Sequence, residues 1–190
     1  MLSMKSFSFF YILFLALLFS QKTNFAQVHY FSFHYEPIWT SVSRHSNDVD
    51  YFLPINLGIS YSYKIFDRWG LSLRGGYIPP FQRYFGGLQY GVYLKHYWKY
   101  GLNILSGINN NLYTSGNHAN SVSVNKKNFL YFVIGLGYMT GAFDIELQYL
   151  PPLAREIGYE LINAPTIEGS HSPVYINAMI KVSIAYCIEL

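Results

Sequence analysis

The clearest pattern in the chain is a strict alternation of apolar residues over its last seventeen positions. From Val174 to Leu190 every even-numbered residue is apolar, whereas the odd positions include Asn177, Lys181 and Glu189. Successive side chains of a β-strand point to opposite faces, so the pattern predicts a strand with one wholly apolar face. Neither glycine nor proline interrupts the run. We interpret it as the closing strand of a barrel.

Seven earlier segments show the same two-residue period. The third of them is expected to stop at Pro79-Pro80, because proline cannot donate to a sheet ladder. The fifth fades into three consecutive asparagines at 109–111. The seven predicted strands cover residues 28–36, 53–65, 71–77, 86–98, 102 to about 109, 130–138 and 143–149.

The connections between these strands alternate in length. They run long, short, medium, short, long, short and long, with polar loops at 40–50 and 113–127 and the longest loop at 151–173. In barrels of the outer membrane, short turns face the periplasm and longer loops face outside. The sequence therefore predicts an all-β fold, an eight-stranded antiparallel up-and-down transmembrane β-barrel.

The chemistry of the two strand faces separates a membrane barrel from a soluble one. A soluble barrel or sandwich would show the same period, but bulky apolar faces on all eight strands exceed what so small an interior holds. Outward tyrosines and tryptophans fall at two heights, as lipid interfaces favour. The short-turn set is Tyr61, Tyr63, Trp98, Tyr138 and Tyr186, and the loop-end set is Tyr35, Tyr77, Tyr84 and Tyr149.

Composition agrees with this interpretation. The chain carries 19 Tyr, 15 Phe and 3 Trp, and only 12% of its residues are charged. Soluble domains average about a quarter charged residues. Beyond the first 26 residues no segment is apolar for the ~20 residues that a membrane-spanning helix requires.

The beginning of the chain has the features of a secretory signal peptide. Lys5 precedes a thirteen-residue apolar run from Phe7 to Phe19, and Ala26 suits the position before a cleavage site. The apolar run is too short to span a membrane as a helix. We therefore divide the chain into a signal peptide, 1–26, and an outer-membrane β-barrel domain, 27–190. A retained amphipathic anchor is the alternative for 1–26.

Charge and cysteine content exclude several classes of function. Removal of 1–26 takes away Lys5 and Lys22, which leaves 11 basic and 10 acidic residues. A chain so near neutrality gives no electrostatic basis for nucleic-acid binding. Cys187 is the only cysteine, so the chain has no internal disulfide and no zinc cluster. We expect no cofactor and no metal.

Eight charged residues occupy the predicted lumen-facing positions, four of each sign. Charges inside a narrow barrel must pair, because an uncompensated buried ion costs several kcal/mol. A structural plug of ion pairs is favoured, and a gate that exchanges partners is the alternative. The eight are Glu36, Lys64, Arg74, Lys95, Asp144, Glu146, Lys181 and Glu189. Lys181 is expected to pair with Glu146 or Asp144, and Glu36 to lie near the outer rim.

The patterning resembles the small eight-stranded outer-membrane barrels, the family of OmpX and the OmpA membrane domain. The final strand resembles the assembly signal of such proteins through Tyr186, Ile188 and Leu190, although that signal usually ends in an aromatic residue. The resemblance implies insertion by the barrel assembly machinery into a Gram-negative outer membrane, among lipid and lipopolysaccharide. The junction Phe25-Ala26-Gln27 resembles signal peptides of Bacteroidota.

Histidines raise the alternative of an enzyme. His45 and Ser46 are similar to the His and Ser of outer-membrane lipid A deacylases, but those two are separated by one strand residue. Here they are adjacent in a predicted loop, so their side chains diverge and no nucleophile–base pair forms. His118 and His171 are isolated. We therefore identify no catalytic residue.

The predicted role is structural or interactive, through the extracellular loops 37–50, 113–127 and 151–173. Two alternatives stay open: a lipid A-modifying hydrolase, and a narrow porin-like channel for small hydrophobic molecules. The sequence names no ligand, partner or oligomeric state.

Overall fold

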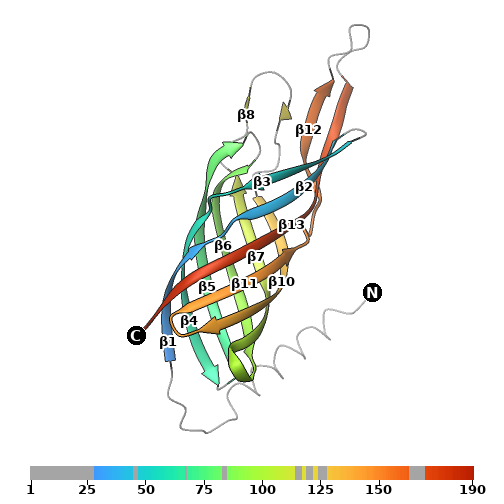
Figure 1. Cartoon of the computed structure of the whole chain (residues 1–190). Helices are drawn as coiled ribbons and strands as arrows, with labels where there is room; N and C mark the ends of the chain where they lie inside the picture. The colour runs from blue at the N-terminus through green and yellow to red at the C-terminus, as the bar shows by residue number, and fades with distance from the viewer. Residues whose placement is uncertain are drawn as a thin grey trace, which may run out of the picture.

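The protein folds into a closed antiparallel barrel (Figure 1). The computed structural model describes residues 28–44, 47–66, 68–82, 85–113, 117–118, 122–123, 128–162 and 170–190. Within these ranges, eight strands pair in sequence order and the last pairs back with the first. The predicted fold class is therefore confirmed. The ring consists of β1 (Val28–Tyr35), β4 (Leu57–Phe66), β5 (Trp69–Gln82), β6 (Phe85–Tyr97), β7 (Leu102–Tyr113), β10 (Asn128–Thr140), β11 (Phe143–Leu150) and β13 (Ser170–Glu189).

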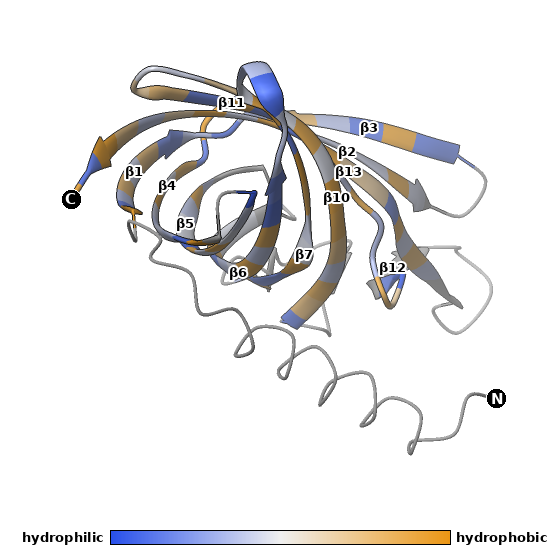
Figure 2. Cartoon of the chain, turned by 90° about the horizontal axis from the view of Figure 1, so that it is seen from below, coloured by the Kyte–Doolittle hydropathy of each residue, from blue (hydrophilic) through white to orange (hydrophobic). Residues whose placement is uncertain are grey.

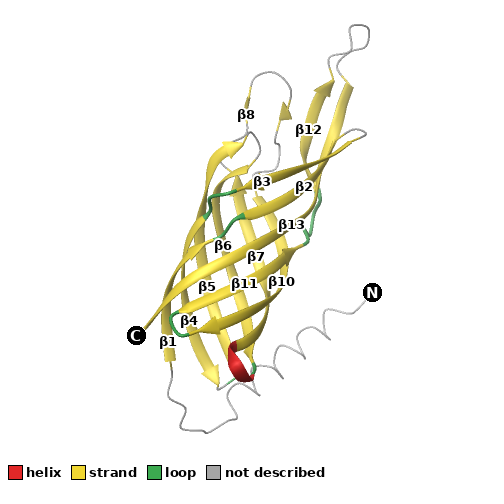
Figure 3. Ribbon diagram, in the orientation of Figure 1, coloured by secondary structure: helices red, strands yellow, loops and turns green. Residues whose placement is uncertain are grey.

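Tight turns close one end of the barrel. A single-turn 3₁₀ helix, η1 (Lys99–Gly101), joins β6 to β7 and is the red element of Figure 3. Gly101 has φ +81°, and a Cβ there would lie 2.2 Å from the carbonyl oxygen of Met139. Only glycine fits this turn, because it combines a left-handed backbone with close contact to a neighbouring strand.

The stagger of the strands fixes the width of the barrel. A row of paired residues that starts at His29 on β1 crosses every strand of the ring and returns at Trp39, ten residues further along the chain. With ~3.3 Å per residue and ~4.8 Å between strands, this stagger tilts the strands by about 40°. An eight-stranded barrel of this kind has an interior that side chains just fill.

A sheet extends beyond the ring at the end opposite the tight turns. β2 (Ile38–Arg44) pairs with β13 and with β3 (Asn47–Leu53). On the other edge of β13 lies β12 (Glu156–Ile162), which also pairs with β9 (Val122–Ser123), and β9 pairs with β8 (Asn117–His118).

The prediction that 40–50 and 151–173 are loops was therefore wrong in large part. The first range forms most of a hairpin, and the second contains β12 and the start of β13. Their Ser, Asn and Asp residues are typical of turns. However, the 20-residue β13 extends beyond its partners β1 and β11, so both edges of its first part are open to pairing with β2 and β12.

Two predicted strand ends were also wrong. β5 continues through Pro79-Pro80 to Gln82, where the β5–β6 register is interrupted between Ile78 and Gln82. Prolines are tolerated where a ladder is irregular, because no hydrogen bond is lost there. β7 continues through the three asparagines to Tyr113.

The single apolar face predicted for Val174 to Leu190 changes side partway along β13. Ile180, Ile184 and Tyr186 point outward, whereas Val174 and Ile176 are buried in the interior. The register with β2 shifts between Ile176 and Ala178. A bulge of this kind adds one residue and reverses which positions face inward.

Large apolar side chains cover the outside of the barrel. Leu136 is 61% exposed, and comparable outward residues occur on every strand of the ring. Figure 2 shows apolar and polar residues alternating along these strands. Among the aromatic side chains, Trp39 stacks on Phe52 at the loop end, with ring centroids 4.6 Å apart. Among the described residues, no helix is long and apolar enough to cross a membrane.

The aromatic residues predicted at two heights are placed outward where the structure describes them. At the tight-turn end, His96 packs against Trp69 and Trp98, with ring centroids 4.5 and 5.9 Å apart. Tyr63 is half-buried, with its ring centroid 4.9 Å from that of His29. Tyr84 lies outside the described residues. The exposed members are Tyr35, Tyr61, Tyr77, Trp98, Tyr138, Tyr149 and Tyr186.

The interior of the barrel contains apolar as well as polar side chains. An apolar core lies in it, and most of its residues come from the loop-side ends of the strands and from the extension. Because the bulge in β13 turns Val174 and Ile176 inward, they contribute to this core. Its members are Ile38, Val42, Leu53, Ile78, Tyr93, Leu105, Tyr113, Phe129, Tyr131, Val133, Leu150, Val174, Ile176 and Met179.

Candidate functional site

Six buried charged side chains form a chain of alternating sign inside the barrel, which we call the charge ladder. None is more than 8% exposed. Successive nitrogen–oxygen distances along it are 3.1, 3.6, 2.6, 2.5 and 2.5 Å. In order, the ladder consists of Lys181, Glu36, Arg74, Glu146, Lys95 and Asp144.

Strand alternation and barrel closure bring the ladder together. Asp144 and Glu146 are two residues apart on β11 and share its inner face. Arg74 projects from β5 and Lys95 from β6, while Lys181 comes from β13. Three cations and three anions leave the ladder neutral, which a buried cluster requires because an unpaired ion would cost several kcal/mol.

The Glu146 carboxylate is contacted through both of its oxygens. Its Oε1 accepts a hydrogen bond from Arg74 Nη2 at 2.6 Å and lies 2.5 Å from Lys95 Nζ. Its Oε2 accepts from Gln148 Nε2 at 2.6 Å. With three donors and 1% exposure, this carboxylate holds the lower half of the ladder together.

Tyr93 fills the space beside the ladder. Arg74 lies over its ring, 4.6 Å from the centroid. Gly91 makes room for the ring, since a Cβ there would lie 2.8 Å from Tyr93 Cε2 and 2.9 Å from its hydroxyl oxygen. Gly107 allows close approach of the β6 backbone, since a Cβ there would lie 2.2 Å from the carbonyl oxygen of Val92. The Tyr93 hydroxyl donates to Asn109 Oδ1 at 2.9 Å.

A row of hydrogen-bonded amides and hydroxyls begins at Tyr93 and runs toward the loop end of the barrel. Asn109 donates to Asn111 at 2.7 Å, and Asn111 donates to the Tyr113 hydroxyl at 3.2 Å. The hydroxyls of Tyr113 and Tyr131 are 3.1 Å apart. Asn109 and Asn111 are thus hydrogen-bonded inside the barrel, whereas Asn110, the third of these asparagines, donates to the Tyr90 hydroxyl.

Two of the eight predicted lumen charges lie apart from the ladder. Lys64 is half-buried, with its ammonium 5.7 Å from the ring centroid of Tyr97. Glu189 is exposed at the end of β13. The other six are the ladder residues themselves.

Two pairing details differ from the prediction. Lys181 contacts Glu36 and not Glu146 or Asp144. Glu36 is within the ladder and not at the rim, because its carboxylate also lies 3.6 Å from Arg74. The two-residue period predicts whether a side chain points into the barrel. Its height along the barrel axis, and therefore its partner across the interior, depends on the ten-residue stagger of the strands.

His34 is a buried residue of the site that sequence reasoning missed. Its Nε2 lies 2.7 Å from Ser60 Oγ and its Nδ1 lies 3.0 Å from Ser183 Oγ. Glu36 Oε1 is 3.8 Å from Nδ1. The available signal was its inward position in β1, which His34 shares with Ser32.

This arrangement brings Ser, His and a carboxylate together without forming an accessible active site. Ser60, His34 and Ser183 are all buried, and the adjoining cavity measures about 10 Å³. A nucleophile must be reached by its substrate as well as by its base. His45 and Ser46 lie outside the described residues, and the side chains of His118 and His171 are not described.

Metal ligation has no evident basis in the described residues. They contain no group of three or more His, Cys, Asp or Glu side chains arranged to hold an ion. Cys187 is a buried free thiol that accepts a hydrogen bond from Ser32 Oγ at 3.3 Å.

Comparison with solved structures finds bacterial proteins at low identity. Neisserial surface protein A matches with a TM-score of 0.42 and 11% identity, over 82% of this chain and 96% of its own. Ail, the attachment invasion locus protein of Yersinia pestis, solved in complex with the heparin analogue sucrose octasulfate, matches with a TM-score of 0.43 and 13% identity, over 84% of this chain and 99% of its own. The N-terminal β-barrel domain of Pseudomonas aeruginosa OprF matches with a TM-score of 0.36 and 14% identity, over 82% of this chain and 97% of its own.

No protein-family model and no curated protein sequence matches the chain. Identities of 11–14% do not transfer a ligand or a role, and the fold described above rests on the strand pairings themselves. The origin in Bacteroidota stays a prediction.

Proposed function

We propose that this chain is an integral outer-membrane β-barrel with a sealed lumen, whose role is structural or interactive at the cell surface. The observation that carries the proposal is the inverted distribution of side chains. Six ionised side chains, those of the charge ladder, are buried inside the barrel, while large apolar side chains cover its outer surface.

An apolar outer surface of this extent requires a lipid environment. Leu57, Leu136 and Leu147 on three different strands are each more than half exposed. Contiguous exposed apolar patches beyond a few hundred Å² are rare on soluble monomers. Lipid tails would cover the band, and the exposed aromatic rings at its two ends suit the interfacial regions.

The filled interior supports a structural or binding role over transport. The charge ladder crosses the middle of the barrel, and the apolar core lies toward its loop end. Interaction would then occur on the extension, where β2, β3 and β12 rise beyond the ring (Figure 1). The segments proposed for partner contact are 37–50, 113–127 and 151–173.

The surrounding partners follow from this location. Lipid and lipopolysaccharide would contact the apolar band, and the barrel assembly machinery would insert the chain through its closing strand, β13. Export would depend on cleavage of residues 1–26, which lie outside the described residues.

Cysteine labelling tests the orientation. Asp50 on β3 is exposed on the extension, whereas Tyr100 is 89% exposed at the tight-turn end. We expect a membrane-impermeant maleimide to label Asp50→Cys on intact cells and Tyr100→Cys only after the outer membrane is permeabilised. The native Cys187 is buried and gives a low background. Labelling of Tyr100→Cys alone on intact cells would reverse the proposed orientation.

Planar-bilayer recording tests the sealed lumen. We expect the purified protein to insert without stepwise conductance, because ladder and core side chains fill the interior. A general porin serves as the positive control, and heat-modifiable gel mobility confirms that the sample is folded. Reproducible channel steps from folded protein would favour the porin-like alternative. Unchanged lipid A mass spectra with and without the protein would count against the hydrolase.

A further inference from the structure

The carboxylate of Glu36 has a marked asymmetry in its contacts. Its Oε2 accepts three hydrogen bonds, from Lys181 Nζ at 3.1 Å, Asn56 Nδ2 at 3.1 Å and Gln89 Nε2 at 3.2 Å. Its Oε1 has no hydrogen-bond donor among the described residues. The nearest cationic group to Oε1 is Arg74 Nη1 at 3.6 Å, beyond hydrogen-bond distance.

Arg74 shows the complementary deficit. Its Nη2 donates to Glu146, but Nε and Nη1 have no hydrogen-bond acceptor within the described part of the chain. Arg74 and Glu36 are both more than nine-tenths buried. Leaving charged groups without a hydrogen-bond partner this deep in a protein is energetically costly, so such groups in folded proteins usually have a partner.

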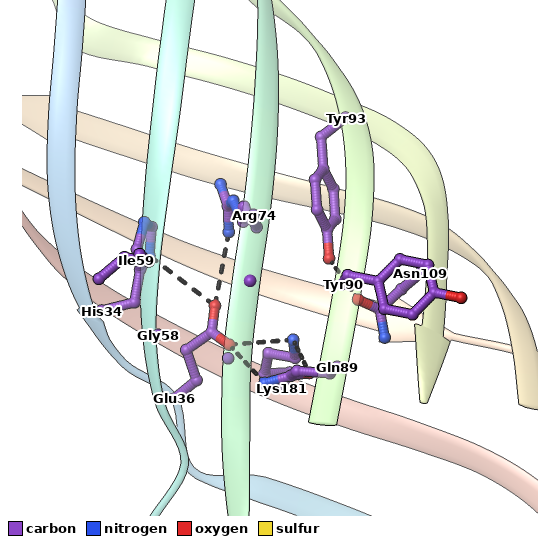
Figure 4. A pocket seen from close by; sticks show the side chains of 12 residues that line it. His34, Glu36, Gly58, Ile59, Arg74, Gln89, Tyr90, Tyr93, Asn109 and Lys181 are labelled. Carbon is purple, nitrogen blue, oxygen red and sulfur yellow. Dashed lines mark hydrogen bonds and ion pairs between the residues drawn. The ribbon is translucent and has the colours of Figure 1, made fainter. Parts of the chain in front are cut away.

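A small cavity lies where these unsatisfied atoms meet. It is lined by His34, Glu36, Gly58, Arg74, Tyr93 and Lys181 among others, and its volume is about 10 Å³ (Figure 4). This is about the space that one water molecule needs. Figure 4 shows the Glu36 carboxylate pointing toward Arg74, with a dashed line for the ion pair between them.

We propose that this cavity is a binding site for a single structural water that bridges Glu36 Oε1 and Arg74. The water donates to Glu36 Oε1 and accepts from Arg74 Nη1 or Nε, which satisfies both orphaned sides. Two atoms 3.6 Å apart can share one water at ordinary hydrogen-bond distances. The flanking cations Arg74 and Lys181 disfavour a bound metal ion, and the volume excludes a larger ligand.

The water divides the charge ladder into two parts. Lys181 and Glu36 form the upper part, and Arg74, Glu146, Lys95 and Asp144 form the lower part. All contacts within each part are at 3.1 Å or less, whereas the junction is at 3.6 Å. The assignment depends on the interior alone and not on what surrounds the barrel.

Two glycine variants provide a matched test by high-resolution crystallography. A Cβ on Gly58, which lines the cavity, would lie 3.7 Å from His34 Cβ and 3.0 Å from the Gly75 carbonyl oxygen. Gly75 also lines the cavity, but it pairs with Ile59, whose side chain points outward, so a Cβ on Gly75 would point away from the interior and meet nothing within 4 Å. Gly58→Ala therefore adds a methyl group at the cavity wall, and Gly75→Ala adds one to open space.

We expect one density peak within hydrogen-bond distance of Glu36 Oε1 and Arg74 in the native protein and in Gly75→Ala. We expect loss of that peak in Gly58→Ala. In micelles, a nuclear Overhauser effect between water and the Arg74 Nε proton should follow the same pattern, which gives a check in solution. A direct Glu36–Arg74 hydrogen bond with no peak between them would overturn the assignment. So would an unchanged peak in Gly58→Ala.

Discussion

Replacement of Glu146 by glutamine is expected to destabilise the folded barrel by about 3–5 kcal/mol, the range for removing one partner of a buried ion pair. The change preserves shape but removes the charge that holds Arg74 and Lys95. The interior then carries three cations against two anions. Because the ladder residues are buried, water cannot compensate that excess charge.

Equilibrium unfolding in urea, followed by tryptophan fluorescence in lipid vesicles, measures this effect. Glu189→Gln is the matched control, because Glu189 is exposed and lies apart from the ladder. Its free energy of unfolding should stay within about 0.5 kcal/mol of the native value, as for most surface substitutions. Equal stabilities of the two variants would show that the ladder does not hold the interior together.

Replacement of Leu136 by arginine is expected to lower the free energy of unfolding by about 2–4 kcal/mol, the range for arginine on a lipid-facing strand at the bilayer midplane. Leu136 lies midway along β10 and is 61% exposed on the outer face. A soluble barrel would tolerate arginine at so exposed a position. The direction of the effect therefore distinguishes lipid from water as the surrounding medium.

The same urea titration measures this effect, with Tyr100→Arg as the control in the exposed tight turn. We expect the Tyr100 variant to unfold at the native urea concentration. If Leu136→Arg were as stable as the native protein, the outer surface would be in contact with water and the proposed membrane location would be wrong.

Alternation in the sequence was sufficient to predict the ring, but not the extension. Where both neighbours of a strand are in the ring, as for β10, face and burial follow the period from Leu130 to Tyr138 without exception. In β13 the bulge between Ile176 and Ala178 reverses the phase, and nothing in the local residues marks it. A two-residue period holds no information about an inserted residue.

The charge ladder was predictable as a set of residues but not as a set of pairs. Of the eight charged residues predicted to face the lumen, six belong to the charge ladder. They could be predicted because the direction in which a strand residue points is a local property of the strand. Which of them meet is a property of the whole ring, so Lys181 reaches Glu36 across a strand stagger that no single segment specifies. His34 was missed because a neutral ring gives no charge-pairing signal.

The wide sequence separation of the ladder partners has a kinetic consequence. Lys181 and Glu36 are 145 residues apart, Arg74 and Glu146 are 72 apart, and Lys95 and Asp144 are 49 apart. None of these attractions is available to a nascent hairpin, and β1 pairs with β13 only when nearly the whole chain is present. Contacts so distant in sequence favour slow folding. Closure of the barrel should therefore be a late step, in which pairing of β13 with β1 and formation of the interior ion pairs occur at the same time.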